Sequence, residues 1–145
     1  MTEAPIGRGF AFKDLRVGFR FRTHRRTVME ADLAAFINLT WLTEELFAVE
    51  EKGKAQLVPG ALVYSFAEGL LLASMQDTGI AFLGATLDVK GPTRVGDTIH
   101  VECEVIEHKL TSKGDRGLVR FLNSVKNQNG ETVLEYNPLR LLKKE

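Results

Sequence analysis

The pair Pro59-Gly60 opens the longest apolar run of the sequence, and the order of these two residues could support chemistry. Pro59 fits the first turn of a helix, where its missing N–H costs nothing. Gly60 would then present a free, positively polarised N–H with no side chain to block a ligand. Such a helix end can hold the oxygen of a bound carbonyl, so we predict substrate binding at Gly60 with Pro59 beside it.

Few other residues are arranged for catalysis. Glu68 lies inside the same apolar run, where a charge needs a partner or an open cavity, and we expect it at a gap in the sheet or at a subunit contact. His24, His100 and His108 each share a strand face with charged residues, so we expect them to face solvent, which argues against Ser–His or Cys–His nucleophile pairs. Cys103 falls on an apolar strand face and is predicted to lie in the core.

A basic cluster precedes the first predicted helix, formed by Arg20, Arg22, Arg25 and Arg26. Arginines of this kind can bind phosphate groups. A solvated strand face explains the same pattern, and both interpretations stay open.

Composition limits the classes of function. The chain has 145 residues, 44% hydrophobic and 26% charged, which is typical of one globular domain. Its formal net charge is zero, so nothing indicates a nucleic-acid partner, and near-neutrality favours self-association. One cysteine allows neither an intrachain disulfide nor a zinc site built on two thiols. We expect a cytoplasmic protein without a secretory signal or membrane span.

The elements that must position these residues follow from hydrophobic periodicity. Residues 59–78 read as one long helix, apolar on nearly every side, that ends at Gly79 as a left-handed cap. A helix of this kind must be surrounded by other structure. A shorter helix is predicted over 27–38, with Thr27 and Glu30 at capping-box spacing.

The other segments alternate as strands do. Residues 19–23 and 98–109 each place one apolar face inward, and 80–89, 118–123 and 131–142 supply further strands between turns. An antiparallel sheet curled around one central helix satisfies both patterns. The predicted fold class is therefore α+β, in the arrangement called a hotdog, with residues 1–145 as a single domain.

Four segments, in this order along the chain, resemble the MaoC-like dehydratase or (R)-specific enoyl-CoA hydratase family of hotdog proteins. They are Phe12–Gly18, similar to that family's opening; Thr27–Phe36, similar to its first helix; Pro59–Leu71, similar to the start of its central helix; and Gly91–Ile99, similar to its Gly-Asp-Thr turn. The resemblance implies a hydro-lyase that takes a coenzyme A thioester as substrate and needs no cofactor. It also implies that the Gly60 N–H polarises the thioester carbonyl, a role that contributes roughly 3 kcal/mol to transition-state binding.

The chain departs from the family where the reaction takes place. The family's catalytic segment reads Gly-Asp-x-Asn-Pro-x-His, and the aligned residues here run from Trp41 to Phe47. Leu42 replaces the Asp and Phe47 replaces the His, and neither side chain can move a proton. Glu44 and Glu45 are the acids in this segment. Beside Trp41 and Phe47, a partly buried carboxylate could act as general acid or base, although helix-dipole-stabilised surface acids fit equally.

The preferred hypothesis is an acyl-CoA hydratase or dehydratase relative with atypical catalytic groups, Glu44 and Glu45, and with Gly60, Trp41, Phe47 and Pro59 at the substrate. Two alternatives remain: an acyl-CoA thioesterase, and a non-catalytic acyl-binding subunit of a hotdog heterodimer. We expect a homodimer or higher homo-oligomer, because one hotdog leaves a sheet edge and one side of its helix poorly covered. Neither nucleic acid nor a membrane is expected as a partner.

Overall fold

The computed structural model describes residues 6–43 and 53–145. Along the chain the elements are η1 (Phe12–Asp14), β1 (Arg20–Arg22), β2 (Arg26–Thr27), α1 (Glu30–Thr40), β3 (Leu57–Val58), α3 (Gly60–Leu70), α4 (Leu72–Met75), β4 (Gly79–Gly84), β5 (Leu87–Val89), β6 (Thr93–Arg94), β7 (Thr98–Leu110), β8 (Arg116–Lys126), β9 (Thr132–Tyr136) and β10 (Leu139–Lys143). This order matches the predicted one: an early strand, a helix, a central helix, then strands.

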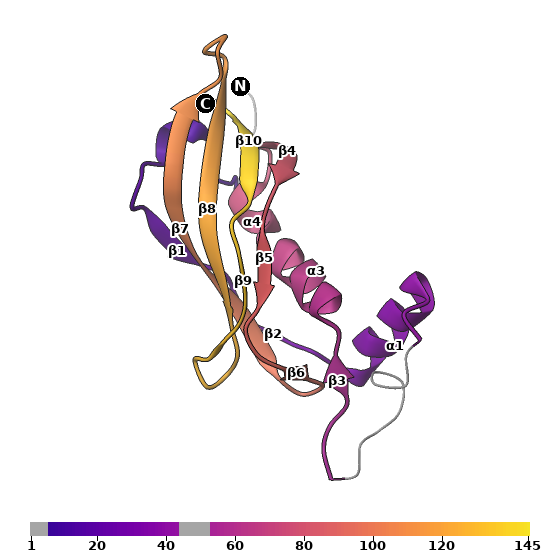
Figure 1. Ribbon diagram of the computed structural model, residues 1–145. Helices are drawn as coiled ribbons and strands as arrows, with labels where there is room; N and C mark the ends of the chain where they lie inside the picture. Colours follow the sequence, from indigo (N-terminus) through magenta and orange to yellow (C-terminus); the bar gives the residue numbers. More distant parts are fainter. Residues whose placement is uncertain (1–5, 44–52) are drawn as a thin grey trace.

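The described residues form an eight-stranded sheet in which every pair of neighbours is antiparallel. Its order runs β1-β7-β8-β10-β4, with β2 continuing the β1 edge on β7, and with β9 joining β8 to β5. A separate two-stranded ladder joins β3 to β6. Figure 1 shows the sheet curving along one side of α3, with α1 set apart beyond the amino end of that helix.

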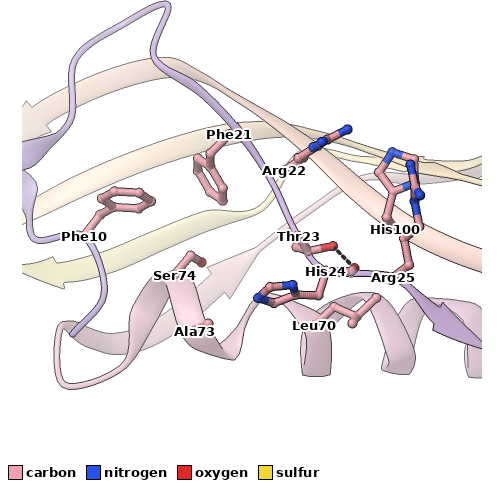
Figure 2. A pocket seen from close by; sticks show the side chains of 10 residues that line it. All are labelled: Phe10, Phe21, Arg22, Thr23, His24, Arg25, Leu70, Ala73, Ser74 and His100. Atoms are coloured by element: carbon pink, nitrogen blue, oxygen red, sulfur yellow. Dashed lines mark hydrogen bonds between the residues drawn. The ribbon is translucent and has the colours of Figure 1, made fainter. Parts of the chain in front are cut away.

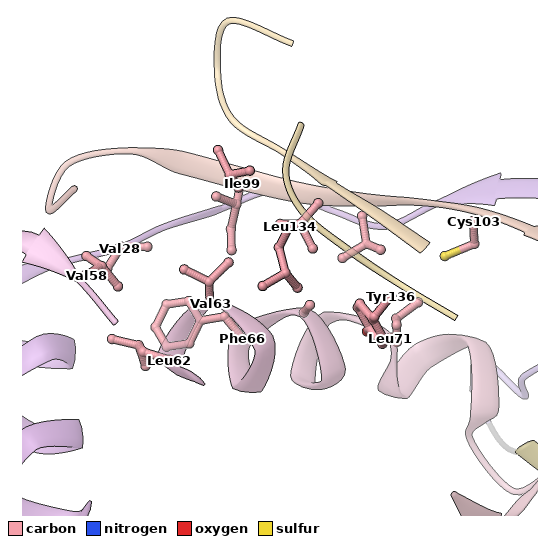
Figure 3. Packing of buried hydrophobic residues seen from close by; sticks show 14 of the residues in the cluster. Val28, Val58, Leu62, Val63, Phe66, Leu71, Ile99, Cys103, Leu134 and Tyr136 are labelled. Carbon is pink, nitrogen blue, oxygen red and sulfur yellow. The ribbon is translucent and has the colours of Figure 1, made fainter. Parts of the chain in front are cut away.

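The main core lies between α3 and the strands behind it. Leu62, Val63 and Phe66 project from the helix and are buried, and they pack in one cluster with Ile99 of β7 and Leu134 of β9. Figure 3 shows Val63 directed from the helix at the sheet, next to Leu134. Each fully buried side chain of this size contributes about 1.5–3 kcal/mol to folding. This packing fixes α3 on the sheet and with it the position of Gly60.

The opposite side of α3 carries exposed residues, which no described element covers. Ala61, Ser65 and Gly69 recur at four-residue spacing along the helix, and all three are exposed. The sequence predicts a helix surrounded by structure, and one chain supplies that cover on one side. The exposed stripe consists of small residues, which permit another backbone to approach closely.

The central helix is shorter than predicted. Regular α3 ends at Leu70, and the four-residue α4 follows after Leu71. Gly79 was expected to end the helix but begins β4, while the left-handed residue of this turn is Asp77 (φ 64°). The break coincides with a long-range contact, because the N–H groups of Gly9 and Phe10 donate to carbonyls of this turn. The hydrophobic pattern of residues 59–78 carries no information about a contact with a segment so far away in the sequence.

The first helix also begins differently from the prediction. Asp32, and not Glu30, returns to the helix start, where its Oδ2 accepts the N–H of Met29 at 2.9 Å. Thr27 belongs to β2, where its hydroxyl lies 2.7 Å from that of Thr98. The predicted Thr27–Glu30 capping box is therefore wrong, because pairing of β2 with β7 delays the helix to Glu30.

The strand predictions hold better. Strand β7 covers 98–110, and Ile99, Val101, Cys103 and Val105 on its inner face are all buried, as their alternation predicts. The strand expected over 131–142 divides into β9 and β10. Pro138 lies between the two, where its missing N–H cannot break a ladder.

Candidate functional site

A pocket of about 240 Å³ opens at the amino end of α3. We call it the Gly60 pocket; its lining residues are Leu57, Val58, Gly60, Val63, Val89, Gly91, Pro92, Thr93, Val133 and Leu134. They come from the β3–α3 junction, from β5 and the turn after it, and from β9. The end of the central helix therefore faces a cavity.

The backbone at this helix end is arranged for an acceptor. Pro59 is the N-cap (φ −59°, ψ 141°), and its carbonyl accepts the N–H groups of Leu62 at 3.0 Å and Val63 at 3.2 Å. Gly60 is the first helical residue, and the amide at that position has no acceptor within its own helix. The helix dipole makes it electropositive. Gly60 is half-buried, while Pro59 is buried behind it and does not line the pocket.

A side chain at position 60 would enter the pocket. A Cβ built on Gly60 would lie 3.1 Å from Cγ2 of Val89, closer than ordinary van der Waals contact. A side chain at this position would require the exposed Val89 to shift by a few tenths of an ångström. This close approach gives the residue a physical role beyond helix initiation.

The walls of the Gly60 pocket are mainly apolar. Val63, Val133 and Leu134 form the inner side and are buried, whereas Val89 on the rim is 60% exposed. Thr93 is the polar side chain of the lining and is itself buried. An electropositive amide facing an apolar cavity suits a neutral carbonyl that carries an aliphatic group.

The predicted catalytic segment is described only at its start. Trp41 ends α1 in a left-handed conformation (φ 61°), is 84% exposed, and does not line the Gly60 pocket. Leu42 is half-buried. Glu44, Glu45 and Phe47 lie outside the described residues, so their roles stay predictions.

Glu68 is held in a partly buried ion pair. Its Oε1 accepts Nη1 of Arg140 at 3.0 Å, and its Oε2 accepts Nη2 of Arg140 at 2.6 Å and the Tyr136 hydroxyl at 2.7 Å. Arg140 is 5% exposed, and both partners belong to strands of the sheet. A carboxylate that accepts three such hydrogen bonds has a structural role. The charge of Glu68 is balanced by Arg140, which is 72 residues away in the sequence.

Two groups near this ion pair are held in their neutral forms. Burial raises the pKa of the Cys103 thiol to about 12. Burial, together with the adjacent Glu68 carboxylate, also raises the pKa of Tyr136. Cys103 lies in the core as predicted, and its thiol is unsuited to nucleophilic chemistry.

The histidines differ from the expectation of three solvent-facing rings. His24 is exposed, but His100 is buried and its Nε2 lies 2.9 Å from Oε2 of Glu102. The ring of His108 stacks on Phe12 at 3.8 Å, and its Nε2 lies 2.9 Å from the Phe12 carbonyl oxygen. The N-terminal segment covers these strand positions, and alternation within β7 carries no information about that cover.

The basic cluster divides into two kinds of arginine. Arg20 pairs with Glu104 at 3.0 Å, and Arg26 pairs with Asp32 at 3.2 Å and lies over the Phe66 ring. Arg22 and Arg25 make no ion pair within the described part of the chain, and both line a second cavity. None of the four lines the Gly60 pocket.

Several lining residues are not identifiable from the sequence as site residues. Val89, Val133 and Leu134 reach the pocket because β5 pairs with β9 in the register Val89↔Leu134. The usable sequence signal is the Gly91-Pro92 breaker, which stops β5 beside the helix end. Among residues 6–43 and 53–145, no group of three His, Cys, Asp or Glu could hold a metal ion. Within the same ranges, no helix combines the length and apolar character required to cross a bilayer.

No protein-family model and no curated protein matches this chain. Solved structures do. A monoamine oxidase regulatory protein from Archaeoglobus fulgidus is 28% identical with a TM-score of 0.81, covering 95% of this chain and 97% of its own. A MaoC-like dehydratase from Rhodospirillum rubrum is 26% identical with a TM-score of 0.82, covering 94% and 99%.

A Mycobacterium tuberculosis protein with a double hotdog fold is 20% identical with a TM-score of 0.80, and the match covers 98% of this chain and 46% of that one. One hotdog unit of the longer protein thus corresponds to this whole chain. The chain has the hotdog fold, and its structural neighbours are MaoC-like dehydratases and (R)-hydratases.

Proposed function

We propose that this protein binds an acyl thioester, with the carbonyl oxygen at the Gly60 amide, and acts as a hydratase or dehydratase. The observation that carries the proposal is the Gly60 pocket, an apolar cavity that Gly60, the first residue of the central helix, helps to line. The MaoC-like dehydratase among the structural neighbours supports the reaction class.

The amide acts on the carbonyl as an oxyanion hole does. Hydration of a 2-enoyl thioester places negative charge on the carbonyl oxygen as water adds to the double bond. A fixed N–H donor stabilises that charge without reorganising during the reaction, typically by about 3 kcal/mol. The acyl group would lie against Val63, Val133 and Leu134.

A proton-transferring group must complete the reaction, and we propose Glu44 for this role, with Glu45 as the second candidate. Glu68 is excluded as that group on geometric grounds, because its carboxylate is occupied by Arg140 and Tyr136. No histidine is among the described residues that line the Gly60 pocket, so we propose no histidine as the proton-transferring group.

The experiment is a substrate comparison followed by variants. Purified protein is incubated with short and medium 2-enoyl-CoAs, followed by loss of the enoyl absorbance, and separately with saturated acyl-CoAs, followed by thiol release. The proposal predicts hydration without thiol release. Glu44→Gln is expected to lower kcat by about 100-fold, whereas Glu135→Gln on β9 leaves it unchanged.

Two other outcomes would redirect the assignment. Thiol release from saturated acyl-CoAs would identify a thioesterase. Binding of enoyl-CoA with no turnover would favour a non-catalytic subunit, a reading supported by Leu42 and Phe47 at the positions of the family's Asp and His.

We further propose that a second hotdog unit, normally another copy of this chain, covers strands β4 and β5. Ile80, Phe82, Leu83, Leu87 and Val89 leave a row of exposed apolar side chains along this sheet edge. The exposed small residues of α3 would lie beneath the same partner. The double hotdog fold of the Mycobacterium tuberculosis protein supports this pairing.

A further inference from the structure

A second cavity lies at the other edge of the sheet, between the β1–β2 segment and the end of the central helix. Its volume is about 660 Å³, within the range of small-ligand sites. We call it the edge groove. Figure 2 shows the helical side chains Leu70, Ala73 and Ser74 on one wall and residues of the β1–β2 segment on the other. It shares no lining residue with the Gly60 pocket.

The groove contains cationic side chains that make no ion pair among the described residues. Arg22, His24 and Arg25 line it, and none of the three makes an ion pair within the described residues. Elsewhere in the described chain, Arg20, Arg26, Arg120 and Arg140 are all paired with carboxylates. No Asp or Glu is among the described residues that line the groove, although Glu102, which contacts His100, is also the cross-strand neighbour of Arg22. Unpaired arginines that share one cavity favour an anion.

The groove is apolar at its other end. The rings of Phe10 and Phe21 lie 5.1 Å apart and both line it. Figure 2 shows these rings at one end and the nitrogen atoms of Arg22, Arg25 and His100 at the other. A ligand that fits both ends has a charged head and an apolar body.

Backbone hydrogen bonds hold both walls in place. Phe10 N–H donates to Ser74 O and Gly9 N–H donates to Gln76 O, both at 2.8 Å. On the opposite wall, Thr23 N–H donates to Val101 O, and the Thr23 hydroxyl accepts the Val101 N–H, both at 2.9 Å. The groove is therefore formed before a ligand arrives, which lowers the entropic cost of binding.

The sheet order keeps this region away from the apolar edge. β1 lies at one end of the strand order and β4 at the other.

We propose that the edge groove binds a small organic anion with an apolar body, such as a carboxylate or phosphate monoester on an alkyl chain, with the anion at Arg22 and Arg25 and the alkyl chain against Phe10 and Phe21. The site is independent of the thioester proposal.

The test is a titration of the purified full chain by calorimetry and by backbone amide NMR. The probes are octanoate, octyl phosphate, octanol, octyltrimethylammonium and inorganic phosphate. Octanoate or octyl phosphate is expected to bind and to shift the amide signals of Thr23 and Ala73. Octanol, the cationic analogue and inorganic phosphate are each expected to bind at least tenfold more weakly.

Variants locate the site. Arg22→Gln combined with Arg25→Gln is expected to weaken binding at least tenfold, and Ala73→Glu on the opposite wall is expected to do the same. Arg20→Gln, which removes an arginine of the same segment that does not line the groove, serves as the control and stays within twofold. Circular dichroism verifies that each variant is folded.

Three results would overturn the proposal: binding of neither anionic amphiphile, equal binding of octanol or the cationic analogue, or an equal loss in Arg20→Gln. Equal binding of inorganic phosphate would also overturn it, because the apolar end would then contribute nothing. These results leave the enoyl-CoA experiment unaffected, since that experiment concerns the Gly60 pocket.

Discussion

At the scale of single residues, Gly60 does what an ordinary side chain would prevent. The 3.1 Å approach of a Cβ at position 60 to Val89 means that alanine would crowd the amide and the pocket rim together. We predict that Gly60→Ala weakens acyl-thioester binding about tenfold, equivalent to roughly 1.4 kcal/mol, without loss of folding. Alanine is otherwise a better helix former than glycine.

The matched control for this variant is Gly60→Ala combined with Val89→Ala, which removes the crowding methyl group. Binding measured by calorimetry should recover most of the loss. Equal weakening in the single and double variants would show that crowding against Val89 is not the cause.

Glu68 is a structural residue, and its removal should be costly. Glu68→Gln would leave Arg140, buried in the sheet, without its countercharge. We expect a loss of about 3 kcal/mol in the free energy of unfolding, measured with urea. The double variant Glu68→Met with Arg140→Met should be more stable than Glu68→Gln alone, because it removes both charges. A loss below about 1 kcal/mol in Glu68→Gln would show that the ion pair contributes little.

Cys103 should resist thiol reagents until the chain unfolds. Its pKa is raised from 9.0 to about 12 by burial, so the folded state favours the protonated thiol. A raised pKa stabilises the fold fully below pH 9, and this stabilisation falls as the pH rises through 9 toward 12. At pH 8 we expect the folded protein to react with a disulfide reagent only at its unfolding rate, and the denatured protein to react at once. Fast labelling of the folded protein would contradict the buried position.

At the scale of elements, the strands were more predictable than the helix ends. The alternation in 98–109 determines β7 because one face of the strand is buried along most of its length. The helical pattern in 59–78 likewise finds α3, but the helical segment ends near Ser74 and Gln76, whose carbonyls accept the N–H groups of Phe10 and Gly9, more than 60 residues away. The capping-box prediction failed for the same reason, because Thr27 is engaged by β7.

The candidate site was predictable only in part. Local sequence places Gly60 at the start of an apolar helix, and the structure has a pocket there. The walls, including Val89 and Leu134, depend on which strands pair, and no local pattern carries that information. Arg140 as the partner of Glu68 is likewise a product of topology. The same limit applies to the edge groove, whose walls come from residues 10–25 and 70–74.

At the scale of the whole molecule, one chain leaves a row of apolar side chains on β4 and β5. Leu83→Asp, in the exposed part of that row, should dissociate the assembly, because a partner would have to bury the new carboxylate. Light scattering after gel filtration should give the mass of one chain for Leu83→Asp and a multiple of it for the unmodified protein.

Leu110→Asp is the control, because Leu110 is also an exposed leucine but lies at the far end of β7. It should retain the mass of the unmodified protein. An unmodified protein of 16.2 kDa in solution would contradict the proposed pairing.

Carbonyl binding at the amino end of α3 is tested most directly by the backbone amide signal of Gly60. This signal is followed during titration with an unreactive acyl-CoA analogue that keeps the carbonyl. A hydrogen bond to that carbonyl should move the Gly60 amide proton downfield in a saturable manner, while the amide of Gly69 on the same helix moves much less. A Gly60 signal that stays unchanged while the analogue binds would contradict the assignment of this helix end as the carbonyl site.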